Sequence, residues 1–137
     1  MMKKTLIDSG PLIALFDRDD RYHKASLEFI QNNRNELVTT IASITETLHL
    51  LDFNRNAQVD FLKWVNAGAL IIEPITADDF QRIQELIEKY ADLPMDFADA
   101  CLVFLGEKFH IDQIATIDRD FDVYRLAGEK TFTTFIK

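Results

Sequence analysis

Two aspartates, Asp96 and Asp99, stand three residues apart at the start of the otherwise apolar stretch LPMDFADACLVFL. An acid that caps a helix, or lies in its first turn, is favoured by the free backbone N–H groups and by the helix macrodipole. That explains one of the two carboxylates. It does not explain the second, because the neighbours Phe97, Ala98 and Cys101 indicate that this helix is buried.

Three other acids fall where a sheet would gather them. Asp8 ends a predicted strand, Asp118 ends the run IATI, and Glu46 lies early in the helix predicted after the second strand. In open α/β sheets, active sites lie beyond the carboxyl ends of the strands. We therefore expect these three acids to meet Asp96 and Asp99 at one end of the sheet.

Carboxylates that converge in this way repel one another. Two unit charges about 5 Å apart, at an effective dielectric constant near 20, repel by roughly 3 kcal/mol. A folded protein retains several such pairs only with a bound cation or with raised pKa values. Because the set contains no histidine or cysteine, it favours a hard cation, Mg²⁺ or Mn²⁺, over Zn²⁺. Together the acids predict a metal site.

Each acid also has a simpler structural explanation when it is taken singly. Asp8 precedes Ser9-Gly10 and would serve as a turn residue or a helix cap. Ser43 and Glu46 have the spacing of a capping box, in which Glu46 is exposed. Asp118 would begin a simple turn. These alternatives stay open for the single residues, and only their convergence favours the metal site.

The elements that must position these acids follow from the pattern of apolar residues. Strands are predicted at residues 4–8, 36–40, 70–75 and 114–117, with a more polar edge strand at 130–135. Helices are predicted between them; Asp78 or Asp79 would open one, with Phe80 on its inner face, and the quoted stretch begins the next. Short apolar strands that alternate with helices indicate a mainly parallel sheet covered on both faces.

The composition fits a soluble globular domain. The chain has 137 residues, 47% hydrophobic and 28% charged, with no linker or repeat, so residues 1–137 are expected to form one domain. No stretch has the character of a signal peptide or a membrane span. Cys101, the one cysteine, excludes an internal disulfide and fits a reducing compartment. We therefore expect a cytoplasmic protein that does not contact membranes.

The net charge of −8 argues against general nucleic-acid binding through a basic surface. It does not exclude an enzyme that acts on nucleic acid, because a metal-binding cluster would itself supply several negative charges. Arg119 and Arg125 flank the predicted loop of Asp118 and are the first candidates for phosphate contacts. A solvated side chain or a surface ion pair is the alternative for each arginine.

Four segments carry a family resemblance. They are TLIDSGPLIALFD, TTIASITETLHLL, PMDFADACLV and IATIDRDFDVYR, in this order along the chain. Together they resemble a PIN domain, and the chain is most similar to the VapC-type ribonuclease toxins and their relatives. The resemblance spans essentially the whole chain. It implies a three-layer α/β/α domain with a central, mainly parallel sheet of about five strands.

The resemblance also implies an activity, that of a Mg²⁺- or Mn²⁺-dependent endoribonuclease that hydrolyses RNA phosphodiester bonds with a metal-activated water. The family's catalytic acids fall on Asp8, Glu46, Asp99 and Asp118. Asp8 and Asp99 would hold the principal ion, with Asp118 as a direct or water-mediated ligand. Glu46 would bind through water or complete a second-ion site. The expected partners are an RNA substrate, a cognate antitoxin and a second copy of the chain.

Three further residues match the same family. Asp96 matches an extra acid found in part of it and is a candidate ligand. Ser9 and Thr116 match hydroxyl positions beside the first and last acids. There they would bind a ligand water or steady a carboxylate.

Two other function classes stay open. A PIN-like fold without a working site would serve as an RNA- or protein-binding module, although such a protein has no physical reason to keep repelling acids together. A phosphotransfer or phosphatase-type α/β domain would want a second aspartate two residues after Asp8, where Gly10 stands. An RNA-cleavage assay on Asp99→Asn separates the catalytic class from the binding module.

Overall fold

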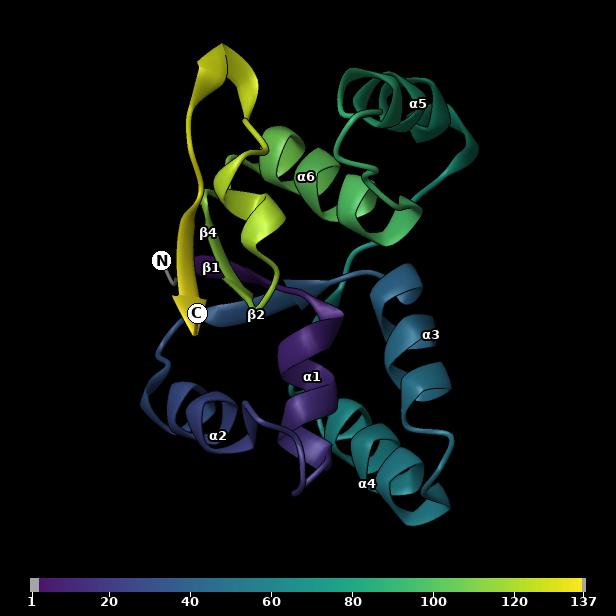
Figure 1. Cartoon of the computed structure of the whole chain (residues 1–137), viewed down its shortest axis with the longest axis vertical. Coiled ribbons are helices and arrows are strands. Elements are labelled where there is room, and N and C mark those ends of the chain that lie inside the picture. Colours follow the sequence, from purple (N-terminus) through teal and green to yellow (C-terminus); the bar gives the residue numbers. More distant parts are fainter. Residues whose placement is uncertain (1–2, 137) are drawn as a thin grey trace.

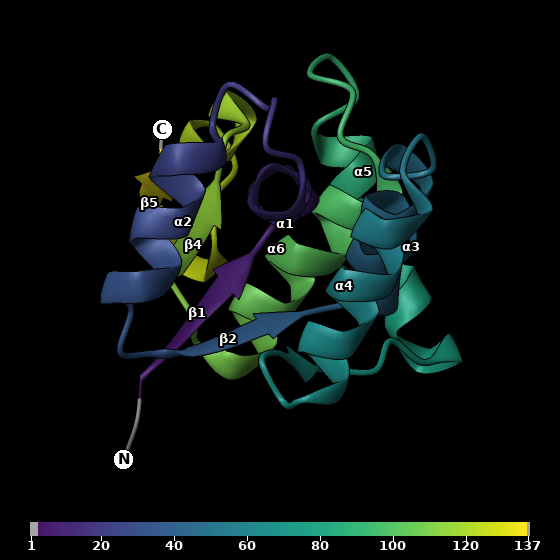
Figure 2. The ribbon, with the colours of Figure 1, turned by 90° about the horizontal axis from the view of Figure 1, so that it is seen from below.

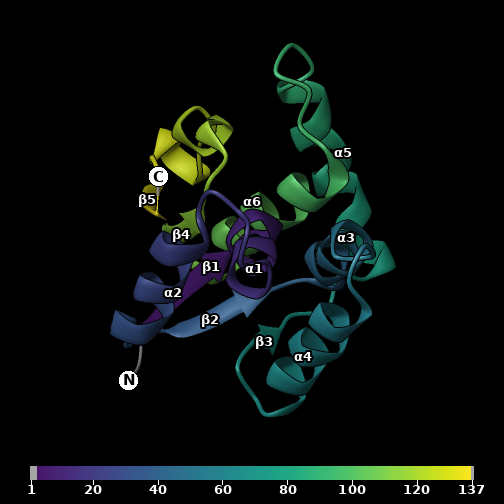
Figure 3. The same cartoon turned by 60° about the horizontal axis from the view of Figure 1, so that its bottom comes forward.

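The central sheet of the computed structural model, which describes residues 3–136, has five strands in the order β3-β2-β1-β4-β5. They are β1 Lys4–Ile7, β2 Glu36–Thr39, β3 Ile71–Ile72, β4 Gln113–Thr116 and β5 Thr133–Ile136. Every neighbouring pair is parallel. β3 and β5 lie at opposite edges of the sheet (Figure 3). This arrangement confirms the predicted parallel sheet with the last strand at an edge.

Helices cover both faces of the sheet. They are α1 Ser9–Phe16, α2 His23–Asn32, α3 Ile41–Leu50, α4 Arg55–Asn66, α5 Phe80–Lys89 and α6 Phe97–Phe109, with short 3₁₀ turns η1 Ala77–Asp79, η2 Arg119–Asp122 and η3 Ala127–Glu129. Figure 1 shows α5 and α6 on one side of the sheet and α1, α2 and α4 on the other. The three-layer α/β/α architecture is confirmed. None of the described helices is long and apolar enough to cross a membrane.

Successive residues of the inner strands face two different cores, as the pleat of a strand requires. In β1, Leu6 packs into the core beneath α5 and α6, whereas Ile7 packs into the core formed with α1, α3 and α4. β2 and β4 repeat this alternation. Because both faces of these strands are buried, each carries two successive apolar residues, one for each core, and the polar residues stand at the strand ends or are buried threonines. Figure 2 shows β1 leading directly into α1, so the residue between them lies at the carboxyl end of the sheet.

Helix α6 runs through the core on the α5 side. Each residue from Ala98 to Gly106 is buried, which confirms the predicted central helix. Gly106 permits a close approach: a Cβ there would lie 2.8 Å from Leu126 Cδ2 and 2.9 Å from the backbone oxygen of Ile111. The core therefore fixes the position of α6, including the first turn that carries Asp99.

The start of α3 does not form the capping box of Ser43 and Glu46 that the sequence allowed. Thr40 is the N-cap of this helix, and its hydroxyl accepts a hydrogen bond from Ser43 N at 3.3 Å. Ser43 is therefore inside the helix, and the capping box of Ser43 with Glu46 is wrong. Glu46 has a different partner, described below.

The segment between β3 and α5 also departs from the prediction. β3 ends well before residue 75 because Pro74 has no N–H to donate to the neighbouring strand. Asp79 is the N-cap residue of α5, one of the two predicted positions, but its side chain does not cap that helix. It instead closes a capping box with Thr76, the N-cap of the preceding turn η1. Phe80, expected on the inner face of α5, is 53% exposed. This segment therefore presents apolar side chains to the surface near the site.

Candidate active site

Three of the predicted acids converge at the carboxyl ends of the strands. Asp8 follows β1 and Asp118 lies two residues beyond β4, and these two strands are neighbours in the sheet. Asp99 reaches the same place from the first turn of α6. A carboxylate oxygen of each acid lies within 4.8 Å of the other two. We call Asp8, Asp99 and Asp118 the acid cluster.

Asp8 is buried, and its two oxygens accept from different donors. Ser9 N donates to Oδ1 at 2.8 Å, because Asp8 is also the N-cap of α1. Thr116 Oγ1 donates to Oδ2 at 3.0 Å and itself accepts from Asp118 N at 2.9 Å. Asp8 thus caps a helix and belongs to the acid cluster at once. Thr116 supports the cluster from the end of β4.

Burial and mutual repulsion favour the protonated forms of Asp8 and Asp99. Burial is the largest cause that raises the pKa of Asp8 to about 7, and its two hydrogen bonds offset this only in part. Burial also raises the pKa of Asp99 to about 8, followed by repulsion from Asp8 and the other site acids. At neutral pH the cluster therefore holds protons, which an arriving cation would displace.

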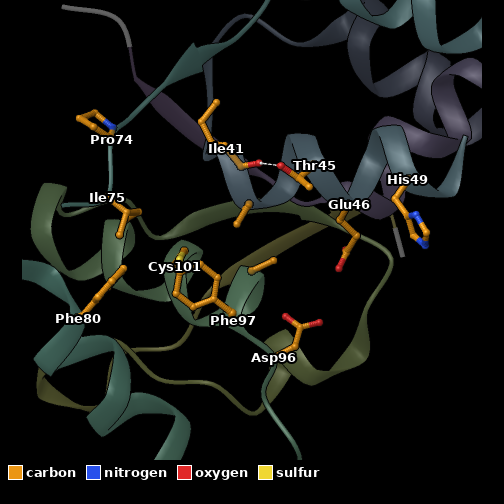
Figure 4. A pocket seen from close by; sticks show the side chains of 12 residues that line it. Ile41, Thr45, Glu46, His49, Pro74, Ile75, Phe80, Asp96, Phe97 and Cys101 are labelled. Atoms are coloured by element: carbon orange, nitrogen blue, oxygen red, sulfur yellow. Dashed lines mark hydrogen bonds between the residues drawn. The ribbon is translucent and has the colours of Figure 1, made fainter. Parts of the chain in front are cut away.

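Glu46 lies on α3 and is not one of the three acids within 4.8 Å of one another. Its Oε1 accepts a hydrogen bond from Ser9 Oγ, at the start of α1. Figure 4 shows the carboxylates of Glu46 and Asp96 directed into the same space. Glu46 therefore lies beside the acid cluster, bound to the start of α1.

Asp96 is the N-cap of α6 and is exposed. Its Oδ1 accepts from Asp99 N at 2.8 Å, and it lies outside the acid cluster. Its charge is one of those that raise the pKa of Asp99. The two aspartates of the sequence motif therefore divide into a cap, Asp96, and a buried member of the cluster, Asp99.

A buried tyrosine that the sequence analysis missed contacts this cluster. The hydroxyl of Tyr124 donates to Asp99 Oδ2 at 3.3 Å, and the tyrosine side chain is fully buried. Burial, followed by the charge of Asp99, raises the pKa of Tyr124 above its ordinary value, so the hydroxyl remains a donor. The sequence offers one hint, the spacing of Phe121 and Tyr124 by a single turn, which is consistent with both rings pointing inward.

The two candidate phosphate ligands differ in their surroundings. Arg119 is exposed at the start of η2. Arg125 donates from Nη1 to the backbone oxygens of residues 122, 123 and 124. Arg125 therefore braces its own loop, which makes Arg119 the better candidate for a phosphate contact.

An apolar groove of about 900 Å³ opens beside the acid cluster (Figure 4). Glu46 and Asp96 line it, and they accept hydrogen bonds from Ser9, next to Asp8, and from the backbone of Asp99. Its apolar lining comes from α3, α6, the segment before α5 and the first residue of α5, and includes Ile41, Ala42, Ile75, Phe80, Phe97 and Ala98. Cys101 also lines the groove, but burial raises the pKa of its thiol to about 12, which argues against a nucleophilic role.

The fold and the site define an α/β protein with three converging carboxylates, two buried and one half-buried, at the carboxyl edge of a parallel sheet. The PIN domain family matches residues 5–126 of the chain. The chain therefore belongs to the PIN domain family.

Individual relatives agree with this assignment. The chain is 28% identical over 131 residues to Ribonuclease VapC26 of Mycobacterium tuberculosis (strain ATCC 25618 / H37Rv), covering 93% of this chain and 97% of that protein. Its fold is similar to the crystal structure of Mycobacterium tuberculosis VapC20, a sarcin-ricin loop cleaving toxin, with a TM-score of 0.80 and 21% identity over 87% of this chain and 93% of the other. It is also similar to a chain of a toxin-antitoxin complex from Klebsiella pneumoniae, with a TM-score of 0.60 and 21% identity over 90% of this chain and 91% of the other. The expected resemblance to VapC proteins is confirmed.

Proposed function

We propose that the protein is a Mg²⁺- or Mn²⁺-dependent endoribonuclease that hydrolyses RNA phosphodiester bonds and acts as the toxin of a toxin-antitoxin pair. The observation that carries this proposal is the acid cluster, in which carboxylate oxygens of Asp8, Asp99 and Asp118 lie within 4.8 Å of one another. Membership of the PIN domain family and similarity to a ribonuclease over 93% of the chain support it.

The acid cluster fits a hard divalent cation. Its donors are carboxylate oxygens alone, which Mg²⁺ and Mn²⁺ prefer. Two of its members are buried and have raised pKa values, so a bound cation would favour their ionised forms at neutral pH. A bound ion would lower the pKa of its water and offset negative charge on the phosphoryl oxygens.

The residues of the chain divide the remaining work. Asp8 and Asp99 are the proposed direct ligands, and Asp118 is a direct or water-mediated ligand. Glu46, held by the Ser9 hydroxyl, orients a water or completes a second-ion site. Thr116 holds the carboxylate of Asp8 in place.

Two groups complete the proposed site at its periphery. Arg119 is the proposed contact to a substrate phosphate, with Arg125 in a supporting role on the same loop. Asp96 caps α6 and contributes charge next to Asp99. The proposed assignment leaves Asp96 outside the direct ligands.

An antitoxin is the proposed protein partner. The similarity to a chain of a toxin-antitoxin complex supports this, and so does the apolar groove beside the acid cluster. A partner bound there would restrain access to the acids. A homodimer stays a prediction, and exposed apolar residues on α3 and α4 could form its interface.

RNA cleavage by the purified protein tests the catalytic proposal. We expect cleavage that requires Mg²⁺ or Mn²⁺, stops with EDTA, and falls by about 100-fold or more in Asp8→Asn and Asp99→Asn, because metal-stabilised charge is worth several kcal/mol. Asp60→Asn is a matched control, since Asp60 is an exposed acid on α4. Equal cleavage by the native protein and Asp99→Asn would exclude the proposed site. Absence of cleavage in both, with the cation bound, would favour a binding module.

A further inference from the structure

Tyr124 lies just beyond η2, on the loop that begins at Asp118, and its side chain is fully buried. Its hydroxyl donates to Asp99 Oδ2 across 3.3 Å. We propose that Tyr124 is a positioning residue that fixes the carboxylate of Asp99 for the cation and ties it to the loop of Asp118. This inference rests on the proposed function of Asp99 as a ligand.

Packing alone does not require the hydroxyl of Tyr124. The ring makes edge-to-face contacts with Tyr90 and Phe121, each with ring centroids 5.0 Å apart. A phenylalanine at position 124 would make the same two contacts. A hydroxyl removed from water is costly unless it is hydrogen-bonded, and the acceptor recorded for this one is Asp99. The hydroxyl is therefore explained by the site rather than by the core.

The hydrogen bond constrains the plane of the Asp99 carboxylate. A carboxylate has about four lone-pair positions, so one oxygen can accept from Tyr124 while the group also binds a cation. Fixing the carboxylate in advance means that less freedom is lost when the ion binds. The donor–acceptor distance of 3.3 Å is long for an O–H···O bond.

The same residue joins two members of the acid cluster through the backbone. Asp118 caps η2 by accepting from Asp120 N at 2.9 Å, and Tyr124 N donates to Asp120 O at 3.1 Å. Tyr124 therefore couples the loop that carries Asp118 to the helix that carries Asp99.

Two tyrosine-to-phenylalanine variants test this role. Tyr124→Phe removes the hydroxyl on Asp99, and Tyr90→Phe removes a hydroxyl from the same ring cluster that touches no acid of the site. We expect Tyr124→Phe to weaken Mn²⁺ binding by about tenfold or more, measured by titration calorimetry on folded protein. Tyr90→Phe should bind Mn²⁺ as the native protein does, and circular dichroism should show both variants folded.

A double variant distinguishes an effect that acts through Asp99 from a general loss of structure. The residual Mn²⁺ affinity of Asp99→Asn can be measured by electron paramagnetic resonance at millimolar Mn²⁺. The double variant Asp99→Asn with Tyr124→Phe should have an affinity within about twofold of that of Asp99→Asn alone, because Tyr124 acts only through the Asp99 carboxylate. Native-like Mn²⁺ affinity in Tyr124→Phe would overturn this inference alone. An equal loss in Tyr90→Phe, or a full further loss in the double variant, would also overturn it. Failure of the native protein to bind Mn²⁺ would overturn the proposed cation site, and this inference with it.

Discussion

Thr116 Oγ1 donates a hydrogen bond of 3.0 Å to Asp8 Oδ2, although the two residues are 108 positions apart in the chain. The same hydroxyl accepts from Asp118 N at 2.9 Å. One buried hydroxyl therefore links two acids that follow neighbouring strands. Because β1 and β4 are paired directly, with Ile7 opposite Ala115, the pairing fixes this link.

Thr116→Val should weaken both the fold and cation binding. It leaves a buried carboxylate oxygen and the N–H of Asp118 without their partner, which costs about 1–3 kcal/mol in the free energy of unfolding. We also expect weaker Mn²⁺ binding, because Asp8 loses the donor that holds it. Urea unfolding and Mn²⁺ titration measure the two effects, and Thr116→Ser, which keeps the hydroxyl, should restore both.

Thr39 provides the matched control for this change. It is a buried strand threonine whose hydroxyl donates to Ile7 O at 2.9 Å and touches no carboxylate. Thr39→Val should lower stability to a similar degree and leave Mn²⁺ affinity near the native value. If Thr39→Val weakened Mn²⁺ binding as much as Thr116→Val, the effect would come from the strands and not from Asp8.

The metal-free protein should lose stability as the pH rises through the range in which its buried acids titrate. The ordinary pKa of Asp8 and Asp99 is 3.8, and in the folded protein the values are raised to about 7 and about 8. Between these limits the folded state binds more protons than the unfolded state, so the free energy of unfolding falls with pH. The loss is complete about one pH unit above the pKa of Asp99. Thermal unfolding in EDTA across this range measures it.

Two comparisons assign that pH dependence to the acid cluster. In Asp99→Asn the free energy of unfolding should fall less with pH, and at the alkaline end this variant should be more stable than the native protein by about 1–2 kcal/mol. In Asp60→Asn the free energy of unfolding should fall with pH as it does in the native protein. Saturating Mn²⁺ should abolish it in the native protein, because the ion displaces the protons and stabilises the folded state by mass action. A flat profile for the metal-free native protein would contradict the raised pKa values.

Asp96 should behave as a helix cap rather than as a ligand. Asp96→Ala removes the acceptor for Asp99 N and should cost about 1 kcal/mol of stability. Asp96→Asn keeps a capping side chain and should leave stability nearly unchanged. Mn²⁺ affinity should fall far less in either variant than in Asp99→Asn. Titration of the three variants side by side decides this, and a loss in Asp96→Asn equal to that in Asp99→Asn would make Asp96 a ligand.

Local and topological rules explain why much of this protein could be predicted from its sequence. The runs KTLI and IATI are short and end or centre on apolar residues, so they predict buried parallel strands, and parallel strands place the residues after them at one end of the sheet. Asp8 and Asp118 follow from that rule, and Asp99 follows from a charge in a buried helix. The errors were also local. Thr40, not Ser43, caps α3, and α5 is preceded by a turn that Thr76 caps and that was not predicted, because several residues near each helix start have capping side chains.

The sequence by itself therefore determined the α/β architecture and the acids at the strand ends, because both depend on apolar patterns that act within one element or between paired strands. Only the tertiary structure decided how those acids are held. The bonds from Ser9 to Glu46, from Tyr124 to Asp99 and from Thr116 to Asp8 span 37, 25 and 108 positions. No local pattern encodes such contacts, since packing of whole elements brings their side chains together.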